Sequence, residues 1–238
     1  MNPPDKSKLA AEVFDACAKQ YQSKFMDLGN YHDTFDFFCD AIQPNQASVF
    51  DIACGPGNIT QYLLKKRPDL NILGIDLATA MVELAQKNNP TASFRVMDAR
   101  NLSSLDQTFD AVICGFCLPY LHREESMKLI SDAAGLLKPG GVFYLSTMEG
   151  DYDKSGWKAS SDGRYQTFTH YYAYNDLIRG LERNGFQQLK TYRKEYVETD
   201  GSSTMDLIII SRKFYLGFIF LFFLPEISHC FQVSYSNE

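Results

Sequence analysis

Three acidic residues stand at positions where a ligand could be held. Asp51 begins the glycine-rich sequence Asp51-Ile52-Ala53-Cys54-Gly55-Pro56-Gly57, and Asp76 and Asp98 each end a later apolar run. Gly55 and Gly57 permit positive φ and let the backbone approach a ligand closely. A helix that begins after this loop presents free N–H groups and a partial positive charge, which suit an anion.

The three carboxylates match the parts of an adenine nucleoside ligand. Asp76, at the end of the second predicted strand, is placed to accept both hydroxyls of a ribose. Asp98 can accept from an exocyclic amine while the backbone N–H of Ala99 donates to a ring nitrogen. Asp51 can hold a cationic group or orient the loop. The sequence therefore predicts a site for an anion, a ribose and an adenine.

The sequence argues against two other kinds of adenine-nucleotide site. A dinucleotide loop has a third glycine where Thr60 stands, and a carboxylate before the loop suits an amine better than a pyrophosphate. A nucleoside-triphosphate loop would carry a lysine that this segment lacks. Both patterns argue against NAD and ATP.

A sheet must bring these residues together, because they are far apart in the chain. Apolar runs alternate with helical patterns, and the runs are continuous rather than alternating, as in a parallel sheet covered on both faces. Right-handed crossovers then give a doubly wound α/β sheet. The predicted strands are 48–53, 71–76, 94–98, 109–114, 142–146, 189–197 and 205–211, with helices at 59–66, 78–87, 126–137 and 175–183 and a hairpin turn at 198–202.

The segments around this pattern have distinct compositions. Residues 5–43 are amphipathic with helical spacing, interrupted at Gly29-Asn30. Residues 149–170 are polar and rich in Gly, Ser and Asp, so a loop is expected in an insert of about 149–172. Residues 214–224 are apolar and lead into the end of the chain.

In this order the motifs resemble those of a class I S-adenosylmethionine-dependent methyltransferase of the small-molecule type. The resemblance covers roughly residues 45–148, and Ala53 departs from it because the family often has glycine there. It rests on the glycine-rich loop, Asp76, Asp98-Ala99, Phe109-Asp110-Ala111-Val112 and Leu137-Lys138-Pro139-Gly140-Gly141. It implies a seven-stranded, mostly parallel Rossmann-like sheet with the last strand antiparallel.

The resemblance also implies domain boundaries, a cofactor and a reaction. Residues 1–44 would form an N-terminal helical lid, 45–213 the cofactor-binding domain and 214–238 an apolar extension. S-adenosylmethionine would pass its methyl group by in-line displacement, so the protein mainly has to align reactants and exclude water. The expected cofactor-binding residues are Tyr21, Asp51, Ala53, Cys54, Gly55, Gly57, Asp76, Leu77, Met81, Asp98, Ala99, Cys114 and Phe116.

The methyl acceptor should meet the cofactor above residues 114–122. Tyr120 and His122 are the nearest candidates for a catalytic base, although a surface histidine that opens the next helix is the alternative for His122. An aromatic-rich insert would favour a flat or cationic acceptor; its candidate substrate contacts are Tyr152, Trp157, His170 and Tyr171. Core packing is the alternative for each. The acceptor is a small molecule that the sequence does not identify, and a non-catalytic, cofactor-binding regulator or partner protein with the same fold is the alternative function.

Composition excludes several other classes of protein. The 238 residues carry a net charge of −6, with 45% hydrophobic and 22% charged residues, which is ordinary for a globular protein. A net negative chain is a poor generic binder of nucleic acid. The first residues have no apolar signal-peptide core and the six cysteines are scattered, so a cytoplasmic protein with free thiols and no metal is expected. Metal or redox use of Cys114 and Cys117 is the weaker alternative.

The apolar extension has several interpretations. Its eleven-residue run is too short for a bilayer span, which needs about 20 residues. It could pack on the core, add a strand, form a homodimer contact or domain swap, or contact a membrane surface through the preceding Arg212-Lys213. A foreign end is a further alternative. Residues 214–238 hold eight aromatics, so part of the chain's aromatic surplus belongs to this extension rather than to a pocket.

Overall fold

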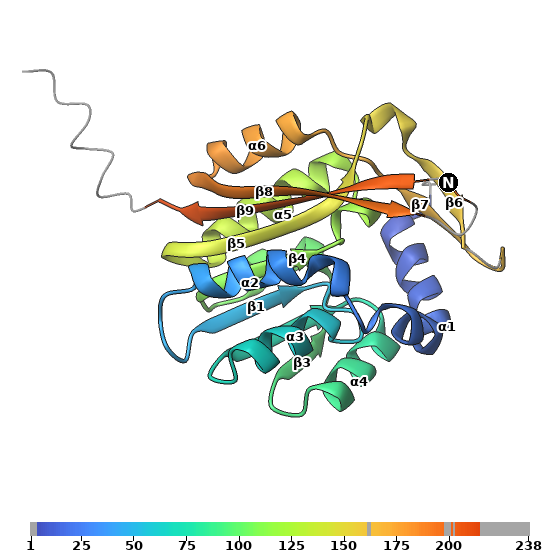
Figure 1. Cartoon of the computed structure of the whole chain (residues 1–238). Helices are drawn as coiled ribbons and strands as arrows, with labels where there is room; N and C mark the ends of the chain where they lie inside the picture. Colours follow the sequence, from blue (N-terminus) through green and yellow to red (C-terminus); the bar gives the residue numbers. More distant parts are fainter. Residues whose placement is uncertain (1–3, 161–162, 198–200, 202, 215–238) are drawn as a thin grey trace, which may run out of the picture.

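A seven-stranded sheet forms the centre of the protein (Figure 1). This computed structural model describes residues 4–160, 163–197, 201 and 203–214. The strands lie in the order β3-β2-β1-β4-β5-β9-β8. Their bounds are β1 (Ser48–Ile52), β2 (Asn71–Asp76), β3 (Ser93–Val96), β4 (Phe109–Gly115), β5 (Leu137–Glu149), β8 (Phe186–Val197) and β9 (Ser203–Lys213).

The strand directions confirm the predicted topology. The pairs β1–β2, β2–β3, β1–β4 and β4–β5 are parallel. The last strand, β9, runs antiparallel to both of its neighbours, β5 and β8. The sheet is therefore the predicted doubly wound, mostly parallel Rossmann-like sheet, and its antiparallel strand lies inside the sheet rather than at its edge.

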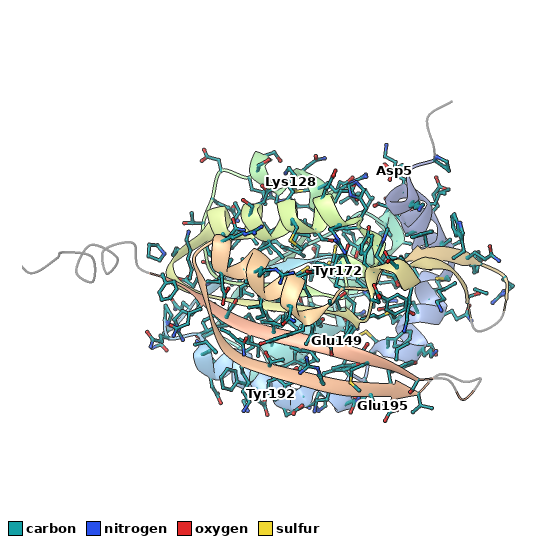
Figure 2. The ribbon with its side chains drawn as sticks, turned by 90° about the horizontal axis from the view of Figure 1, so that it is seen from above. Asp5, Lys128, Glu149, Tyr172, Tyr192 and Glu195 are labelled. Atoms are coloured by element: carbon teal, nitrogen blue, oxygen red, sulfur yellow. The ribbon has the colours of Figure 1, made fainter. Side chains whose placement is uncertain are left out.

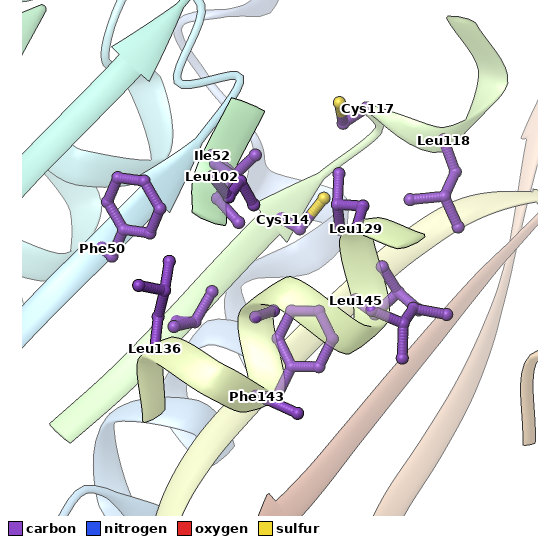
Figure 3. Close-up of a cluster of buried hydrophobic side chains, with 14 of the residues drawn as sticks. Phe50, Ile52, Leu102, Cys114, Cys117, Leu118, Leu129, Leu136, Phe143 and Leu145 are labelled. Carbon is purple, nitrogen blue, oxygen red and sulfur yellow. The ribbon is translucent and has the colours of Figure 1, made fainter. Parts of the chain in front are cut away.

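Helices cover both faces, which is why the central strands are apolar throughout. Side chains of α2 (His32–Ala41) and α3 (Asn58–Lys66) pack on one face, and those of α5 (Arg123–Leu136) and α6 (Tyr174–Arg183) on the other. Between the sheet and α5, Figure 3 shows Phe50, Cys114 and Phe143 from the strands close to Leu129 and Leu136 from the helix. α4 (Thr79–Asn88) packs against β2 and β3.

The N-terminal residues form two helices with different roles. α1 (Lys6–Phe25) is capped by Asp5, whose side chain accepts from the N–H groups of Ser7 and Lys8, and it packs against α4 and the insert. A 3-10 turn, η1 (Gly29–Tyr31), separates it from α2, as the Gly29-Asn30 break predicted. α2 packs on the sheet with Phe35 and Phe38 in the core. Of the two helices, α1 is the one that stands apart from the sheet layers.

The insert contains a hairpin where the sequence predicted a loop. β6 (Gly156–Ala159) pairs with β7 (Gln166–Thr169), after the short 3-10 helix η4 (Tyr152–Lys154). Trp157 and Phe168 lie opposite each other with ring centroids 5.7 Å apart, a cross-strand pair that stabilises the hairpin. The polar residues between the strands obscured this signal in the sequence.

Parts of the predicted chain organisation lie outside the described residues. These are residues 215–238 of the apolar extension and all of the turn at 198–202 except Gly201. The interpretations of the extension therefore stay predictions. Within the described part of the chain, no helix has both the length and the apolar character needed to cross a membrane.

Candidate functional site

The loop after β1 has the backbone of a ligand-binding turn. Ala53, Gly55 and Gly57 all have positive φ, at 56°, 52° and 77°. A Cβ on Gly57 would lie 2.3 Å from Asn89 Nδ2 and 3.1 Å from the Cα of Ala85, so only glycine fits there. Ala53 adopts the same left-handed region with a Cβ present, which costs conformational energy. The departure from the family pattern at this position is therefore a strained one.

Asp51 lies beneath this loop with one oxygen unsatisfied. Its side chain is fully buried, and Oδ2 accepts a hydrogen bond from Thr60 Oγ1 over 2.6 Å. Oδ1 has no hydrogen-bond partner within the described structure. Burial raises the pKa of Asp51 to about 7, with Asp76 adding to the rise and the Thr60 bond opposing it. The carboxyl therefore has unused capacity to accept from a donor, and it would bind a cation best when ionised.

Asp76 ties the glycine-rich loop to the end of β2. Oδ2 accepts from the N–H of Gly55 and Oδ1 from the N–H of Ala78, each over 2.9 Å. Burial raises the pKa of Asp76, and the two backbone bonds oppose that rise. Each oxygen keeps a second lone pair, which is the capacity that two ribose hydroxyls require.

Asp98 is held by an arginine two residues later. The N–H and Nε of Arg100 donate to Oδ1, and Nη2 donates to Oδ2 over 2.6 Å. Burial alone would raise the pKa of Asp98, but the bonds from Arg100 outweigh it and lower the pKa below its usual value. Asp98 is therefore a fixed, ionised carboxylate, followed by Ala99 at the start of the 3-10 helix η2 (Ala99–Ser104).

A cavity of about 120 Å³ lies at this edge of the sheet. α1 forms one wall, and the ends of β1, β2, β3 and β4 form the others. The residues that line the cavity are Ser7, Ala10, Ala11, Phe14, Tyr21, Ala53, Gly55, Asp76, Leu77, Met81, Met97, Asp98, Ala99, Gly115, Phe116, Cys117, Tyr120 and Leu121.

Most of the predicted cofactor residues meet at this cavity. Asp51, Cys54, Gly57 and Cys114 are absent from the lining and lie in the surrounding loop and strand ends. The lining residues that the sequence did not single out are Ser7, Ala10, Ala11, Phe14, Met97, Gly115, Cys117 and Leu121. Those on α1 share one helical face with Tyr21, a spacing visible in the sequence, but the sequence does not show which distant segment that face packs against.

The two base candidates differ in position. Tyr120 lines the cavity, and burial raises the pKa of its phenol to about 12, so it is protonated at neutral pH. His122 does not line the cavity. Its Nδ1 accepts from the N–H of Glu125 and the Glu125 side chain accepts from the N–H of His122, which makes a capping box at the start of α5.

None of the four candidate substrate contacts lines the cavity. Tyr152 stacks on His170 with centroids 5.4 Å apart, and burial together with Lys6 lowers the pKa of His170 to about 4, so this histidine is neutral. Its Nδ1 is buried without a hydrogen-bond partner in the described structure. Trp157 is half exposed on the hairpin, and Tyr171 packs against Gly150.

No group of three or more His, Cys, Asp or Glu side chains in the described residues is arranged to hold a metal ion. The pattern Cys114-x-x-Cys117 joins a buried strand end to the cavity wall, with both thiols buried. A hydrogen bond with Cys117, together with burial, raises the pKa of Cys114 well above its usual value, so its thiol is protonated.

Residues 49–141 match a family described as "Methyltransferase domain". The chain is 37% identical over 137 residues to demethylmenaquinone methyltransferase of Thermotoga maritima, which covers 56% of this chain and 59% of that protein. It is 33% identical over 102 residues to trans-aconitate 2-methyltransferase of Variovorax paradoxus, covering 43% and 39%. Over residues 49–141 this chain is therefore similar to methyltransferase domains. It spans between about two fifths and three fifths of the length of these curated relatives.

Solved structures share this fold. Magnesium protoporphyrin IX methyltransferase from Synechocystis, with bound S-adenosylhomocysteine, has a TM-score of 0.66 at 20% identity and covers 88% of this chain and 100% of that one. The cyclase SpnF has a TM-score of 0.68 at 16% identity, covering 89% and 98%. Since a cyclase shares the fold, the reaction must be argued from the site.

Proposed function

We propose that the protein is a methyltransferase that moves a methyl group from S-adenosylmethionine to a small-molecule acceptor by in-line displacement. The observation that carries this proposal is the convergence of Asp51, Asp76 and Asp98 on one edge of the sheet, around a loop with three positive-φ residues. Both the curated relatives and the structural neighbours that bear methyltransferase names support the same reaction class.

The residues present fit this cofactor. The unsatisfied Oδ1 of Asp51 suits an ammonium group, and the loop at Gly55 and Gly57 suits a carboxylate. Asp76 would accept from the ribose hydroxyls, and Asp98 with Ala99 would hold the adenine. At Gly115 a Cβ would lie 2.5 Å from the Ile59 side chain, so the chain keeps this wall close-packed without a side chain.

When bound, S-adenosylmethionine supplies an electrophilic methyl group on a sulfonium centre. The protein then has to align the acceptor and keep water out, and such positioning is worth roughly 7–11 kcal/mol. Phe14 and Tyr21 of α1 and Phe116 after β4 would shield the cofactor from water, since all three line the cavity. Tyr120 would donate a hydrogen bond rather than accept a proton, because its phenol is protonated at neutral pH.

The proposal also assigns roles to the segments around the cavity. The lid role of residues 1–44 is supported for α1, which walls the cavity, whereas α2 packs in the core. Roles for Tyr152, Trp157, His170 and Tyr171 in acceptor binding are proposals based on the aromatic contacts of the insert, whose strand β7 packs against α1. The cytoplasmic location and a dimer contact through the extension stay predictions from the sequence.

Calorimetry with S-adenosylhomocysteine tests the cofactor site directly, and micromolar binding is expected. Turnover is tested by S-adenosylhomocysteine formation with a panel of neutral, anionic and cationic acceptors. Asp76→Ala should abolish both, whereas Asp106→Ala, which removes an exposed aspartate, should change neither. Absence of binding by the unaltered protein would refute the proposal. Binding without product across the panel would favour a non-catalytic binding protein.

A further inference from the structure

The guanidinium of Arg100 joins three carboxylates from three separate elements. Its Nη2 donates to Asp98 over 2.6 Å, and its Nη1 donates to Asp5 and Glu125, each over 3.1 Å. Nη2 also lies 3.0 Å from Asp5 Oδ2. The Arg100 side chain is 19% exposed, so these bonds form in a partly desolvated site. They are stronger there than surface ion pairs.

Each of the three carboxylates has a second role in the fold. Asp5 is the N-cap of α1, the helix that walls the cavity. Asp98 lines the cavity and is the carboxylate assigned to adenine. Glu125 belongs to the capping box of α5. Arg100 therefore connects the cavity wall formed by α1 to the adenine-binding end of the cavity.

The placement of α1 and α5 agrees with this connection. Figure 2 shows Asp5 at the start of α1 and Lys128 on α5 toward the same side of the molecule. Lys128 Nζ donates to the backbone carbonyl of Arg100 over 3.1 Å, which holds the segment that carries Arg100 against α5. α1 has other anchors, such as Ser7 Oγ on the carbonyl of Tyr120 over 2.8 Å. The Asp5 anchor differs because it reaches α1 through the residue that fixes Asp98.

The positive charge of the Arg100 guanidinium allows the three carboxylates to lie close together. Three carboxylates brought together would repel one another, and Arg100 is the cation that bonds to all three. Its bonds lower the pKa of Asp5 and of Asp98 against the effect of burial, and the bond to Asp98 is the main cause that raises the pKa of Arg100. The arginine thus keeps Asp98 ionised and fixes its orientation.

Arg100 also limits how Asp98 can bind a ligand. A carboxylate has about four lone-pair positions. Oδ1 accepts from both the backbone N–H and the Nε of Arg100, while Oδ2 accepts from Nη2 and shares Nε at 3.0 Å. The capacity that remains is therefore mainly on Oδ2. One donor, such as an exocyclic amine, can use it, and a carbonyl oxygen in the same place would face an ionised acceptor.

We propose that Arg100 is a positioning residue that couples recognition of the adenine amine to the docking of α1 over the cofactor. The inference rests on the proposed function, because it assumes an adenine nucleoside in the cavity. By holding Asp98 and Asp5 with one guanidinium, Arg100 makes the closed position of α1 and the binding orientation of Asp98 depend on each other. Arg100 itself does not line the cavity.

The test compares two ligands on the full chain by calorimetry. S-adenosylhomocysteine carries the 6-amino group, and S-inosylhomocysteine carries an oxygen in its place. The unaltered protein should prefer the amine about ten- to hundredfold, as expected for a hydrogen bond to a charged group. Arg100→Gln should weaken S-adenosylhomocysteine about tenfold or more and reduce the preference to about threefold or less. Arg95→Gln, which removes an exposed arginine on β3, is the matched control and should change neither value.

Asp5→Asn separates the two ends of the link. It weakens the contact to α1 and leaves the bonds between Arg100 and Asp98, so it should weaken both ligands by a similar factor of about three to ten and keep the preference. Amide hydrogen exchange in α1 should become faster in Asp5→Asn and Arg100→Gln and unchanged in Arg95→Gln. Arg100→Lys, a smaller change, should restore part of the affinity.

The outcomes distinguish failure of the proposed function from failure of the inference about Arg100. If the unaltered protein does not bind S-adenosylhomocysteine, the proposed function fails and takes this inference with it. If the protein binds and Arg100→Gln keeps the full preference for the amine, Arg100 does not position Asp98 and the inference is overturned. If Arg100→Gln does not fold, Arg100→Lys and Asp5→Asn decide. The inference would also be overturned if Asp5→Asn left the affinity unchanged. It would likewise be overturned if Arg100→Lys kept the full preference for the amine at reduced affinity.

Discussion

The backbone N–H of Gly55 donates to the Asp76 carboxylate over 2.9 Å. This bond joins the loop after β1 to the end of β2 before any ligand is present. The acid assigned to the ribose therefore also fixes the loop assigned to the amino-acid part of the cofactor. Removing the Asp76 carboxylate should consequently weaken both halves of the site.

Asp76→Asn tests this double role with little change in shape. The amide can keep one backbone bond but loses the charge and one acceptor. We expect cofactor affinity to fall about ten- to hundredfold. Isothermal titration with S-adenosylhomocysteine measures it, with Asp106→Asn as a control for an exposed aspartate. Affinity within twofold of the unaltered protein would show that Asp76 does not contact the ligand.

The raised pKa of Asp51 predicts that folding stability depends on pH. Because burial raises the pKa of Asp51 to about 7 in the folded protein, the folded state binds a proton more tightly than the unfolded state does. Stability from this group is therefore full near pH 4 and is lost as pH rises toward 7, by up to about 4 kcal/mol. Asp76 is the acidic group that adds to this rise, and it favours the neutral form of Asp51.

Asp51→Asn removes this titration, since the amide is neutral at every pH. Urea unfolding should show the variant more stable than the unaltered protein at pH 8, with the difference shrinking toward pH 5. A difference in stability that grows from pH 5 to pH 8 in favour of the variant would support the raised pKa of Asp51. A variant that is less stable at pH 8 by the same amount as at pH 5 would contradict a raised pKa for Asp51.

Ala53→Gly should stabilise the protein, because Ala53 has a φ of 56°. The left-handed region costs a non-glycine residue roughly 1–2 kcal/mol, which exceeds the entropy cost of glycine. A gain of about 0.5–1 kcal/mol in urea unfolding is expected. Ala80→Gly in α4 is the matched control and should destabilise by about 1 kcal/mol, since its backbone is helical. Equal losses at the two positions would argue against strain at Ala53.

His122 distinguishes a helix cap from a catalytic base. His122→Ala removes the cap of α5 and should cost about 1 kcal/mol of stability. His122→Asn keeps a capping side chain and should cost less than half of that. If His122 only caps the helix, kcat with any accepted substrate should stay within about threefold in both variants. A drop of a hundredfold in both would make His122 the base.

The carboxyl edge of the sheet was predictable because its signals are local. Asp51 begins the glycine-rich loop sequence, Asp76 and Asp98 each end an apolar run, and parallel strands bring their ends to one edge. The Arg100 network was not predictable, since Asp5, Asp98 and Glu125 are linked only by packing of distant segments. The cavity-lining residues of α1 were hidden for the same reason.

The hairpin of the insert was also not predictable from the sequence. Trp157 and Phe168 pair across the hairpin, but a period-two pattern four residues long is easily masked by the polar residues around it. The role of His122 could not be predicted either. A histidine beside a predicted site has the same sequence signal whether it caps a helix or moves a proton. Side-chain direction, which decides between the two, depends on the tertiary structure.

The interior position of β9 sets the order in which the domain can be completed during synthesis. β5 cannot gain its second neighbour, and β8 cannot join the sheet, until residues 203–213 have left the ribosome. Until then the nascent chain carries an unpaired edge on β5 beside the apolar residues Tyr144 and Leu145. Such an edge is prone to pairing with other chains. Translation pauses between the codons for β5 and those for β9 would prolong that exposure, and chaperone demand should peak there.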